Sequence, residues 1–77
     1  MDKDLVEYIA KSLVDDPSAV QVTRTEEENL VVLQLRVAEN DVGKVIGKNG
    51  RIVKALRTLL SASAGNARTR YSLEILD

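Results

Sequence analysis

The sequence predicts an α+β fold in which a three-stranded sheet packs against three helices. Apolar residues recur every four residues near the start of the chain, as on a helix face, and alternate with polar residues in three later segments, as in strands. A glycine-bracketed turn at 47–50 separates a short apolar segment from a long one. The length of 77 residues suits one domain, which we place over residues 1–77.

The first half of the chain is predicted to form a helix and two strands. Leu5, Ile9 and Leu13 form a helical stripe within 4–14, and Pro17 ends this helix because proline disfavours helical backbone just before it. Alternation predicts strands over 20–24 and 30–37, joined by a polar turn at 26–29. The second strand turns one apolar face to the core: Val31, Leu33, Leu35 and Val37.

The second half is predicted to form two helices and a last strand. Asn40 or Asp41 can cap a short helix over 42–46, and the main helix follows the glycine turn over 51–64. Gly65-Asn66 supplies a helix stop, and alternation predicts a strand over 71–75. The predicted order is helix, strand, strand, short helix, long helix, strand.

Charge is divided between the two halves, although the net charge is only −1. Residues 1–41 carry four basic and ten acidic residues, whereas residues 42–73 carry seven basic residues and no acid. A basic overall composition therefore cannot indicate nucleic-acid binding here, but the segregation can. The seven basic residues are Lys44, Lys48, Arg51, Lys54, Arg57, Arg68 and Arg70.

The turn at 47–50 has the properties of a phosphate site. Its two glycines permit a tight turn and the close approach of another backbone. The helix after it offers unpaired amides and a positive dipole end, to which Lys48 and Arg51 add full charges. The alternative is a tight helix–helix turn with solvated lysines. The flanking isoleucines and the basic surroundings favour phosphate binding.

The segment Val45-Ile46-Gly47-Lys48-Asn49-Gly50-Arg51-Ile52 resembles the signature of KH domains, in which a GxxG loop grips single-stranded nucleic acid. The element order is similar to the type II KH arrangement, and the likeness covers essentially the whole chain. The chain thus resembles the small single-KH bacterial RNA-binding proteins of the KhpA family. That resemblance implies a cytoplasmic, dimeric RNA chaperone or post-transcriptional regulator, pairing with itself or with a second KH protein of the KhpB/Jag type.

The resemblance places the RNA-binding residues at the loop, on its apolar flanks and at nearby basic positions. Among the apolar flanks, we expect Ile46 and Ile52 in the core and Val45 and Val53 in the groove under the bases. The expected RNA-binding residues are Gly47, Lys48, Asn49, Gly50, Lys44, Arg51, Lys54, Val45 and Val53.

Binding by one copy should be weak and loosely sequence-selective. Tyr8 and Tyr71 are the two aromatic residues, and neither lies near the loop in the sequence, so strong base stacking is not expected. Three basic side chains that each neutralise one phosphate would give a slope of log affinity against log salt of about −2.

The main helix carries more apolar surface than one sheet requires. Leu59 and Leu60 could pair with another copy, unless the first helix covers them. The apolar residues that cover about half of this helix are Ile52, Val53, Ala55, Leu56, Leu59, Leu60 and Ala62.

Other functional classes find less support. Glu26-Glu27-Glu28 converges poorly on a metal, because consecutive strand residues point to opposite sides. Gly43 to Asn49 lacks the spacing and the Ser or Thr of a P-loop. The chain has no His and no Cys, so we predict no enzyme, no cofactor and no small-molecule substrate. No apolar run is long enough to span a membrane.

Two alternatives to RNA binding stay open. One is a protein–protein adaptor that docks through the helix at 51–64. The other is a DNA-binding helix–turn–helix, for which Arg51, Lys54 and Arg57 would read bases although Ile52 and Val53 are apolar.

Overall fold

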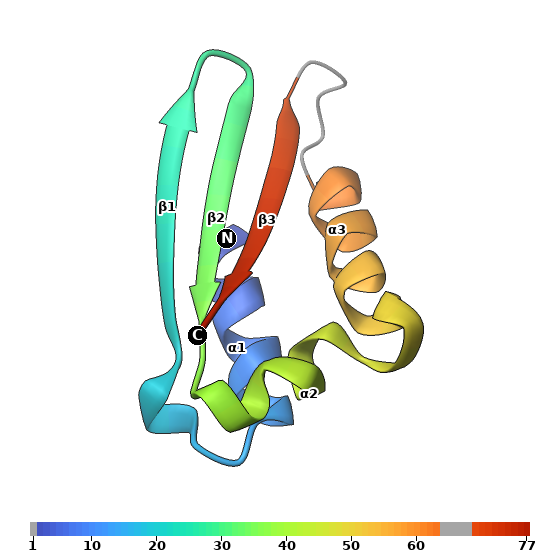
Figure 1. Cartoon of the computed structure of the whole chain (residues 1–77). Coiled ribbons are helices and arrows are strands. Elements are labelled where there is room, and N and C mark those ends of the chain that lie inside the picture. The colour runs from blue at the N-terminus through green and yellow to red at the C-terminus, as the bar shows by residue number, and fades with distance from the viewer. Residues whose placement is uncertain (1, 64–68) are drawn as a thin grey trace.

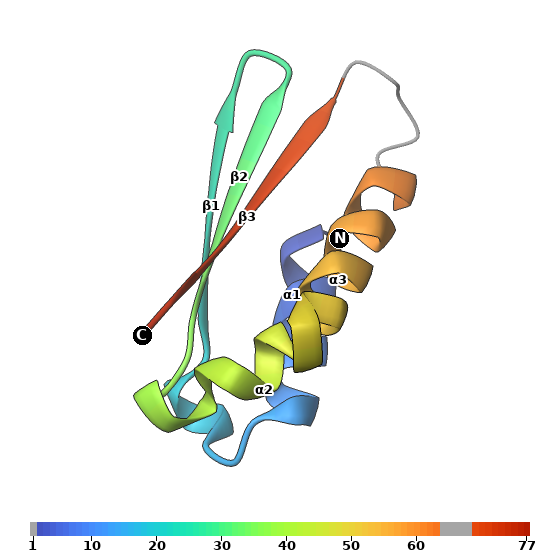
Figure 2. The ribbon, with the colours of Figure 1, turned by 45° about the vertical axis from the view of Figure 1, so that its right-hand side comes forward.

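The computed structural model describes residues 2–63 and 69–77, and it forms two layers. The helices cover one face of a three-stranded sheet, as Figures 1 and 2 show. The elements are α1 (Asp2–Leu13), β1 (Gln21–Glu27), β2 (Leu30–Arg36), α2 (Val42–Ile46), α3 (Arg51–Ser63) and β3 (Arg70–Leu76), with single 3₁₀ turns at Pro17–Ala19, Glu39–Asp41 and Lys48–Gly50. This order and the predicted α+β class are confirmed.

The sheet has the strand order β1-β2-β3. β1 and β2 pair antiparallel, and β2 and β3 pair parallel, so the chain between β2 and β3 must cross over through α2 and α3. The predicted four-residue acidic turn is wrong. Glu26 pairs with Val31 and Glu27 with Leu30, and the turn is Glu28-Asn29, with Asn29 at φ 59°. The acidic side chains stay exposed in the strand, so pairing their backbone requires no burial of charge.

The core lies between the sheet and the helices. Val31, Leu33, Leu35 and Val37 are each at most 2% exposed, which confirms the predicted face of β2. The predicted stripe of α1 is displaced, because Val6 and Ala10 are fully buried while Leu5, Ile9 and Leu13 are half-buried. The smaller side chains thus lie at the centre of the contact with the sheet, and the larger ones flank it.

Several predicted boundaries shift by a few residues. β1 runs further than 20–24, and β3 covers Arg70–Leu76 rather than 71–75. The short helix has the predicted bounds. The proposed helix stop at Gly65-Asn66 lies outside the described residues. Within the described part of the chain, no helix is long and apolar enough to cross a membrane.

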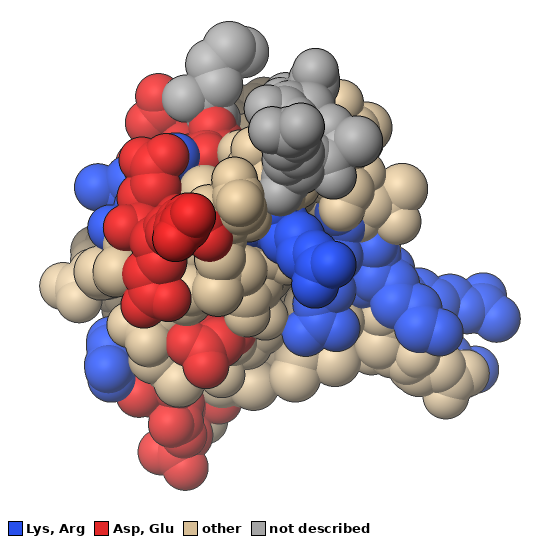
Figure 3. All heavy atoms as spheres, turned by 90° about the horizontal axis from the view of Figure 1, so that it is seen from above, with Lys and Arg blue, Asp and Glu red and all other residues tan. Residues whose placement is uncertain are grey.

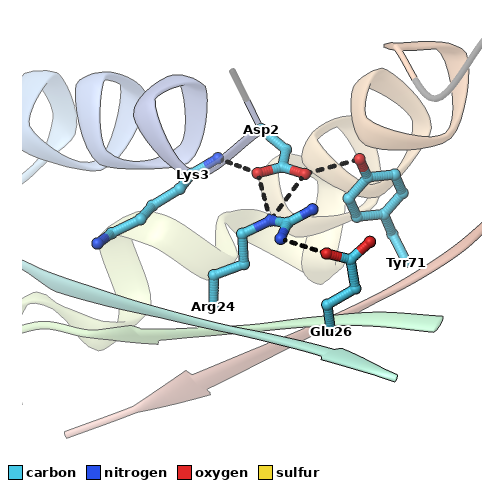
Figure 4. Close-up of polar contacts among 5 residues, drawn as sticks. All are labelled: Asp2, Lys3, Arg24, Glu26 and Tyr71. Carbon is cyan, nitrogen blue, oxygen red and sulfur yellow. Dashed lines mark hydrogen bonds and ion pairs between the residues drawn. The ribbon is translucent and has the colours of Figure 1, made fainter. Parts of the chain in front are cut away.

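A polar cluster fastens the start of α1 to the sheet (Figure 4). The hydroxyl of Tyr71 donates to Asp2 Oδ2 at 2.7 Å, and Arg24 Nε donates to Asp2 Oδ1 at 3.1 Å. Partial burial opposes ionisation of Asp2, but the hydrogen bonds from Tyr71, Arg24 and the Lys3 amide outweigh it, so the pKa of Asp2 lies below its usual value. Residues of β1 and β3 thus hold the first turn of α1 in place.

Candidate nucleic-acid interface

The turn between α2 and α3 has an unusual backbone. Gly47 (φ 78°, ψ 169°), Asn49 (φ 60°) and Gly50 (φ 72°) all have positive φ. The Gly47 conformation is one that essentially only glycine adopts. Asparagine is among the few other residues that tolerate the left-handed region occupied by Asn49.

Gly47 also has no room for a side chain. A Cβ there would lie 2.6 Å from Cγ1 of Ile52, whereas the nearest atom to a Cβ on Gly50 would be 3.9 Å away. Gly47 is therefore required by sterics and by backbone conformation, and Gly50 by conformation alone. These reasons hold whether or not a ligand binds.

The turn uses some of the amides that sequence reasoning left free. The N–H of Gly50 donates to Gly47 O at 3.1 Å, and the N–H of Arg51 donates to Lys48 O. These two groups are engaged within the turn. The positive end of the α3 dipole and the side-chain charges nevertheless remain.

The polar side chains of the turn are open to solvent. Lys48 and Asn49 are exposed, as are Arg51 and Lys54 on the first turns of α3. In the view of Figure 3, acidic side chains gather on the side of β1, and basic side chains gather mostly on the side of α3. The tip of the turn is thus not packed beneath other segments, and Lys48, Arg51 and Lys54 place three positive charges on it or beside it.

The expected division of the apolar flanks is wrong. Val45 is fully buried and Val53 is 8% exposed, so both belong to the core rather than to a groove. Ile46 and Ile52 are the half-buried pair that packs at the margin of the core. Val45 and Val53 point inward because each lies on the side of its helix that faces the sheet and α1.

Lys44 is held by acidic residues of this chain. Its Nζ pairs with Asp15 Oδ2 and, at 3.2 Å, with Asp41 Oδ1. The bond to Asp15, followed by that to Asp41, raises the pKa of Lys44 above its usual value. Its expected role as counter-charge for RNA is therefore diminished, because carboxylates already neutralise it.

Asp41 has a structural role other than the predicted cap of the short helix. Its side chain does not cap α2, but accepts hydrogen bonds from the backbone N–H groups of Asp15 (3.2 Å) and Asp16 (3.1 Å). Burial opposes its ionisation, yet these bonds and Lys44 outweigh burial and lower its pKa. We call Asp41, Lys44 and the backbone at Asp15-Asp16 the α2 brace. The acidic pair Asp15-Asp16 directly after α1 is a signal in the sequence, because carboxylates at a helix C-terminus oppose the helix dipole and so indicate a contact outside the helix.

Arg57 connects α3 to β3. One of its terminal nitrogens, Nη2, donates to the backbone oxygen of Leu73 at 3.2 Å in a partly buried contact. Sequence reasoning counted Arg57 among the basic residues but gave it no place in the RNA site. No local pattern could have revealed a contact between residues 16 positions apart.

The two leucines expected at a dimer interface differ in exposure. Leu60 is fully buried in the core and cannot face another copy, which corrects that part of the prediction. Leu59 is 47% exposed and lies beside the exposed Ala55 and Ala62 on one flank of α3.

The described residues contain no cluster of three or more His, Cys, Asp or Glu side chains that could hold a metal ion. Among these residues, the acidic run at the end of β1 stays exposed along the strand and in its turn.

Comparison with known proteins identifies relatives along the entire length. Residues 3–75 match the family model described as the KH domain of KhpA/KhpB. The RNA-binding protein KhpA of Treponema pallidum (strain Nichols) is 62% identical over 77 residues, covering 100% of this chain and 96% of that protein. KhpA of Borreliella burgdorferi is 50% identical over 74 residues, covering 96% of this chain and 90% of that protein.

Solved structures support the same fold. The structure of Era in complex with MgGDPNP and nucleotides 1506–1542 of 16S ribosomal RNA matches with a TM-score of 0.56 and 22% identity. The match covers 97% of this chain but 29% of the Era chain, so it concerns one part of that larger protein. With its family match, its full-length relatives and this fold, the chain belongs to the KhpA family of KH-domain proteins.

Proposed function

We propose that this chain, as one KH domain over residues 1–77, binds the backbone of single-stranded RNA through the glycine turn. The observation that carries the proposal is the exposed, positive-φ turn with Lys48 and Asn49 at its tip and Arg51 and Lys54 beside it. The relatives named RNA-binding protein KhpA support RNA as the ligand.

The turn and α3 suggest a path for the phosphates. Lys48 lies in the turn, and Arg51 and Lys54 follow at a spacing of three residues, which places them on neighbouring positions of the α3 surface. With Lys44 held in the α2 brace, these three residues are the phosphate contacts. They give an expected salt slope of about −2.

The test is a double substitution in the turn, Lys48→Asp with Asn49→Asp. Lys11→Asp with Ser12→Asp is the matched control, since it changes the net charge equally at two exposed positions on α1. We expect the turn variant to lose at least tenfold in affinity for a single-stranded RNA, and the control to lose much less. Equal losses in two folded variants would show that general electrostatics rather than the turn binds RNA.

We further propose that the protein works as a dimer, or with a second KH protein of the KhpB/Jag type, in RNA chaperoning or post-transcriptional regulation in the cytoplasm. The exposed Leu59 flank supports the interface, and it also supports the alternative of a protein–protein adaptor. Leu59→Glu should convert the protein to a monomer, with Thr58→Glu on the exposed polar side as the control.

Sedimentation and RNA binding, measured together, separate the two roles. An RNA module that binds as a monomer keeps RNA when Leu59→Glu abolishes association. If the protein is an adaptor, Leu59→Glu abolishes binding of its protein partner, and neither the wild-type protein nor the variant binds RNA. We propose no catalytic activity for this chain.

A further inference from the structure

The tip of the glycine turn carries an asparagine that is followed directly by a glycine. Asn49-Gly50 is the single Asn-Gly pair in the sequence, whose other asparagines are Asn29, Asn40 and Asn66. In such a pair, the backbone nitrogen after the asparagine can attack the side-chain amide, because glycine has no side chain to hinder the approach. The sequence therefore places a chemically reactive amide in the proposed RNA site.

The fold leaves the side chain of Asn49 open to this reaction. Asn49 is exposed, and within the described part of the chain its side-chain amide makes no hydrogen bond. Lys48 and Arg51 are exposed basic neighbours, and no acidic residue occurs from 42 to 63. Positive side chains and the positive end of the α3 dipole stabilise the anion that forms when the Gly50 N–H loses its proton. The surroundings of the turn thus favour the attacking nitrogen.

The backbone of Asn49 is partly arranged for ring closure. The Gly50 nitrogen lies on the side of the Asn49 side chain at φ of about +60° and ψ of about −120°, as at the first central position of a type II′ turn. Asn49 has φ 60° and ψ 25°, so ψ is the angle that must rotate. This rotation breaks the hydrogen bond from Gly50 N–H to Gly47 O at 3.1 Å. Opening of the turn therefore limits the rate of the reaction.

We propose that Asn49 is a deamidation site, and that its reaction weakens RNA binding by the turn. The Gly50 nitrogen forms a bond to Asn49 Cγ and gives its proton to solvent, while the side-chain nitrogen takes a proton from water and leaves as ammonia. A water molecule then opens the five-membered ring at either carbonyl, which yields aspartate or isoaspartate. Both products place a carboxylate at the tip of the turn, and isoaspartate also lengthens the backbone by one carbon.

The effect on binding rests on the proposed function, whereas the deamidation itself does not. A carboxylate beside Lys48 repels phosphates, so the RNA affinity of the modified protein should fall about threefold. RNA bound across the turn restrains the backbone of Asn49 and should slow ring closure. Protein bound to RNA would then keep its turn intact, and unbound protein would lose affinity with time.

The experiment incubates the folded protein in mildly alkaline buffer and follows each asparagine by mass spectrometry of its peptide. Asn29 is a matched internal control, because it is exposed and has φ 59° but precedes Leu30. We expect Asn49 to deamidate at least about tenfold faster than Asn29, since a leucine side chain hinders ring closure and glycine does not. A saturating single-stranded oligoadenylate should slow the reaction at Asn49 and leave that at Asn29 unchanged.

RNA affinity is measured on the same samples. The affinity of the wild-type protein should decline in step with the modified fraction of Asn49, toward the affinity of an Asn49→Asp variant. Asn49→Gln should hold its own starting affinity throughout, because glutamine would have to close a larger, less favourable ring.

The outcomes separate the inference from the proposed function. Equal rates at Asn49 and Asn29 in the folded protein would overturn the deamidation site, and an equal decline of affinity in Asn49→Gln would overturn its effect on binding. If the wild-type protein binds no RNA, the proposed function fails, and mass spectrometry still decides whether Asn49 reacts. If RNA binds without slowing the reaction at Asn49, the turn does not hold the RNA, whereas the deamidation site stands.

Discussion

Charged side chains are neutralised at the start of α2 but exposed to solvent at its end. At its start, the α2 brace surrounds the buried Asp41 with Lys44 and two backbone amides, so charge is neutralised within the chain. At its end, the glycine turn leaves Lys48 exposed, and no acidic partner of Lys48 is seen among the described contacts. The difference teaches that a basic residue near a binding motif belongs to the site only if the fold leaves its charge uncompensated.

The largest effect should come from adding a methyl group in the turn. Gly47→Ala places a Cβ 2.6 Å from Ile52 Cγ1 in a glycine-only conformation, so unfolding in urea should show a loss of about 3 kcal/mol. Gly43→Ala is the control, because no atom lies within 4 Å of its Cβ and the position is helical. It should gain about 0.5–1 kcal/mol. Similar effects at the two glycines would contradict the structure of the turn.

The next effect should come from breaking the α2 brace. Asp41→Ala removes the acceptor of the Asp15 and Asp16 amides, and the midpoint of thermal unfolding should fall by roughly 5–10 °C. Glu39→Ala, at an exposed position in the same 3₁₀ turn, should leave the midpoint almost unchanged. If the α2 brace did not stabilise the fold, Asp41→Ala and Glu39→Ala would have equal midpoints of thermal unfolding.

A smaller effect should separate Lys44 from Lys54 in RNA binding. Lys54→Met should lower the salt slope by about 0.7, because it removes one of the three proposed phosphate contacts. Lys44→Met should change the slope much less, since Asp15 and Asp41 already compensate Lys44. Titrations at several salt concentrations measure both slopes. Equal decreases would show that RNA displaces the carboxylates from Lys44.

The fold could be predicted because its signals are local. Periodicity, together with cap and turn residues, predicted the α-helices and strands of the described residues, and α2 has its predicted bounds. The orientation of α1 could not be predicted, since Val6 and Ala10 lie beside the larger Leu5 and Ile9 in the same apolar stripe. The hydrogen bonds of the α2 brace and of Arg57 join residues at least 16 positions distant in the sequence. The one exception among them is the bond between Lys44 and Asp41. Their existence depends on packing that no local pattern records.

The same reasoning limits what the sequence indicates about the site. The glycines, Lys48 and Asn49 stand out because their types and spacing are unusual. Val45 and Ile46 are both apolar, and the sequence does not say which of two neighbours a five-residue helix turns inward. Burial distinguishes them only after the sheet and α1 are in place.

The smallest effect is the loss of stability in acid, and of the two ends of α2 it involves the braced one. The folded state lowers the pKa of Asp41 below its ordinary 3.8, so the ionised carboxylate contributes stability above that pH. This contribution is lost as the pH falls through the lower, folded-state value. Asp2 behaves in the same way, so the wild-type protein should lose stability below about pH 4.

Asp41→Asn cannot ionise, and its stability should therefore fall less steeply over the acid range. Lys48→Met changes the other end of α2 without touching a carboxylate, so its acid profile should parallel that of the wild-type protein. Urea unfolding at pH values from about 5 to 2.5 measures the three slopes. If Asp41→Asn kept the wild-type slope, the carboxylate would have the same proton affinity in the folded and unfolded chains. The α2 brace would then hold Asp41 by geometry without favouring its charge.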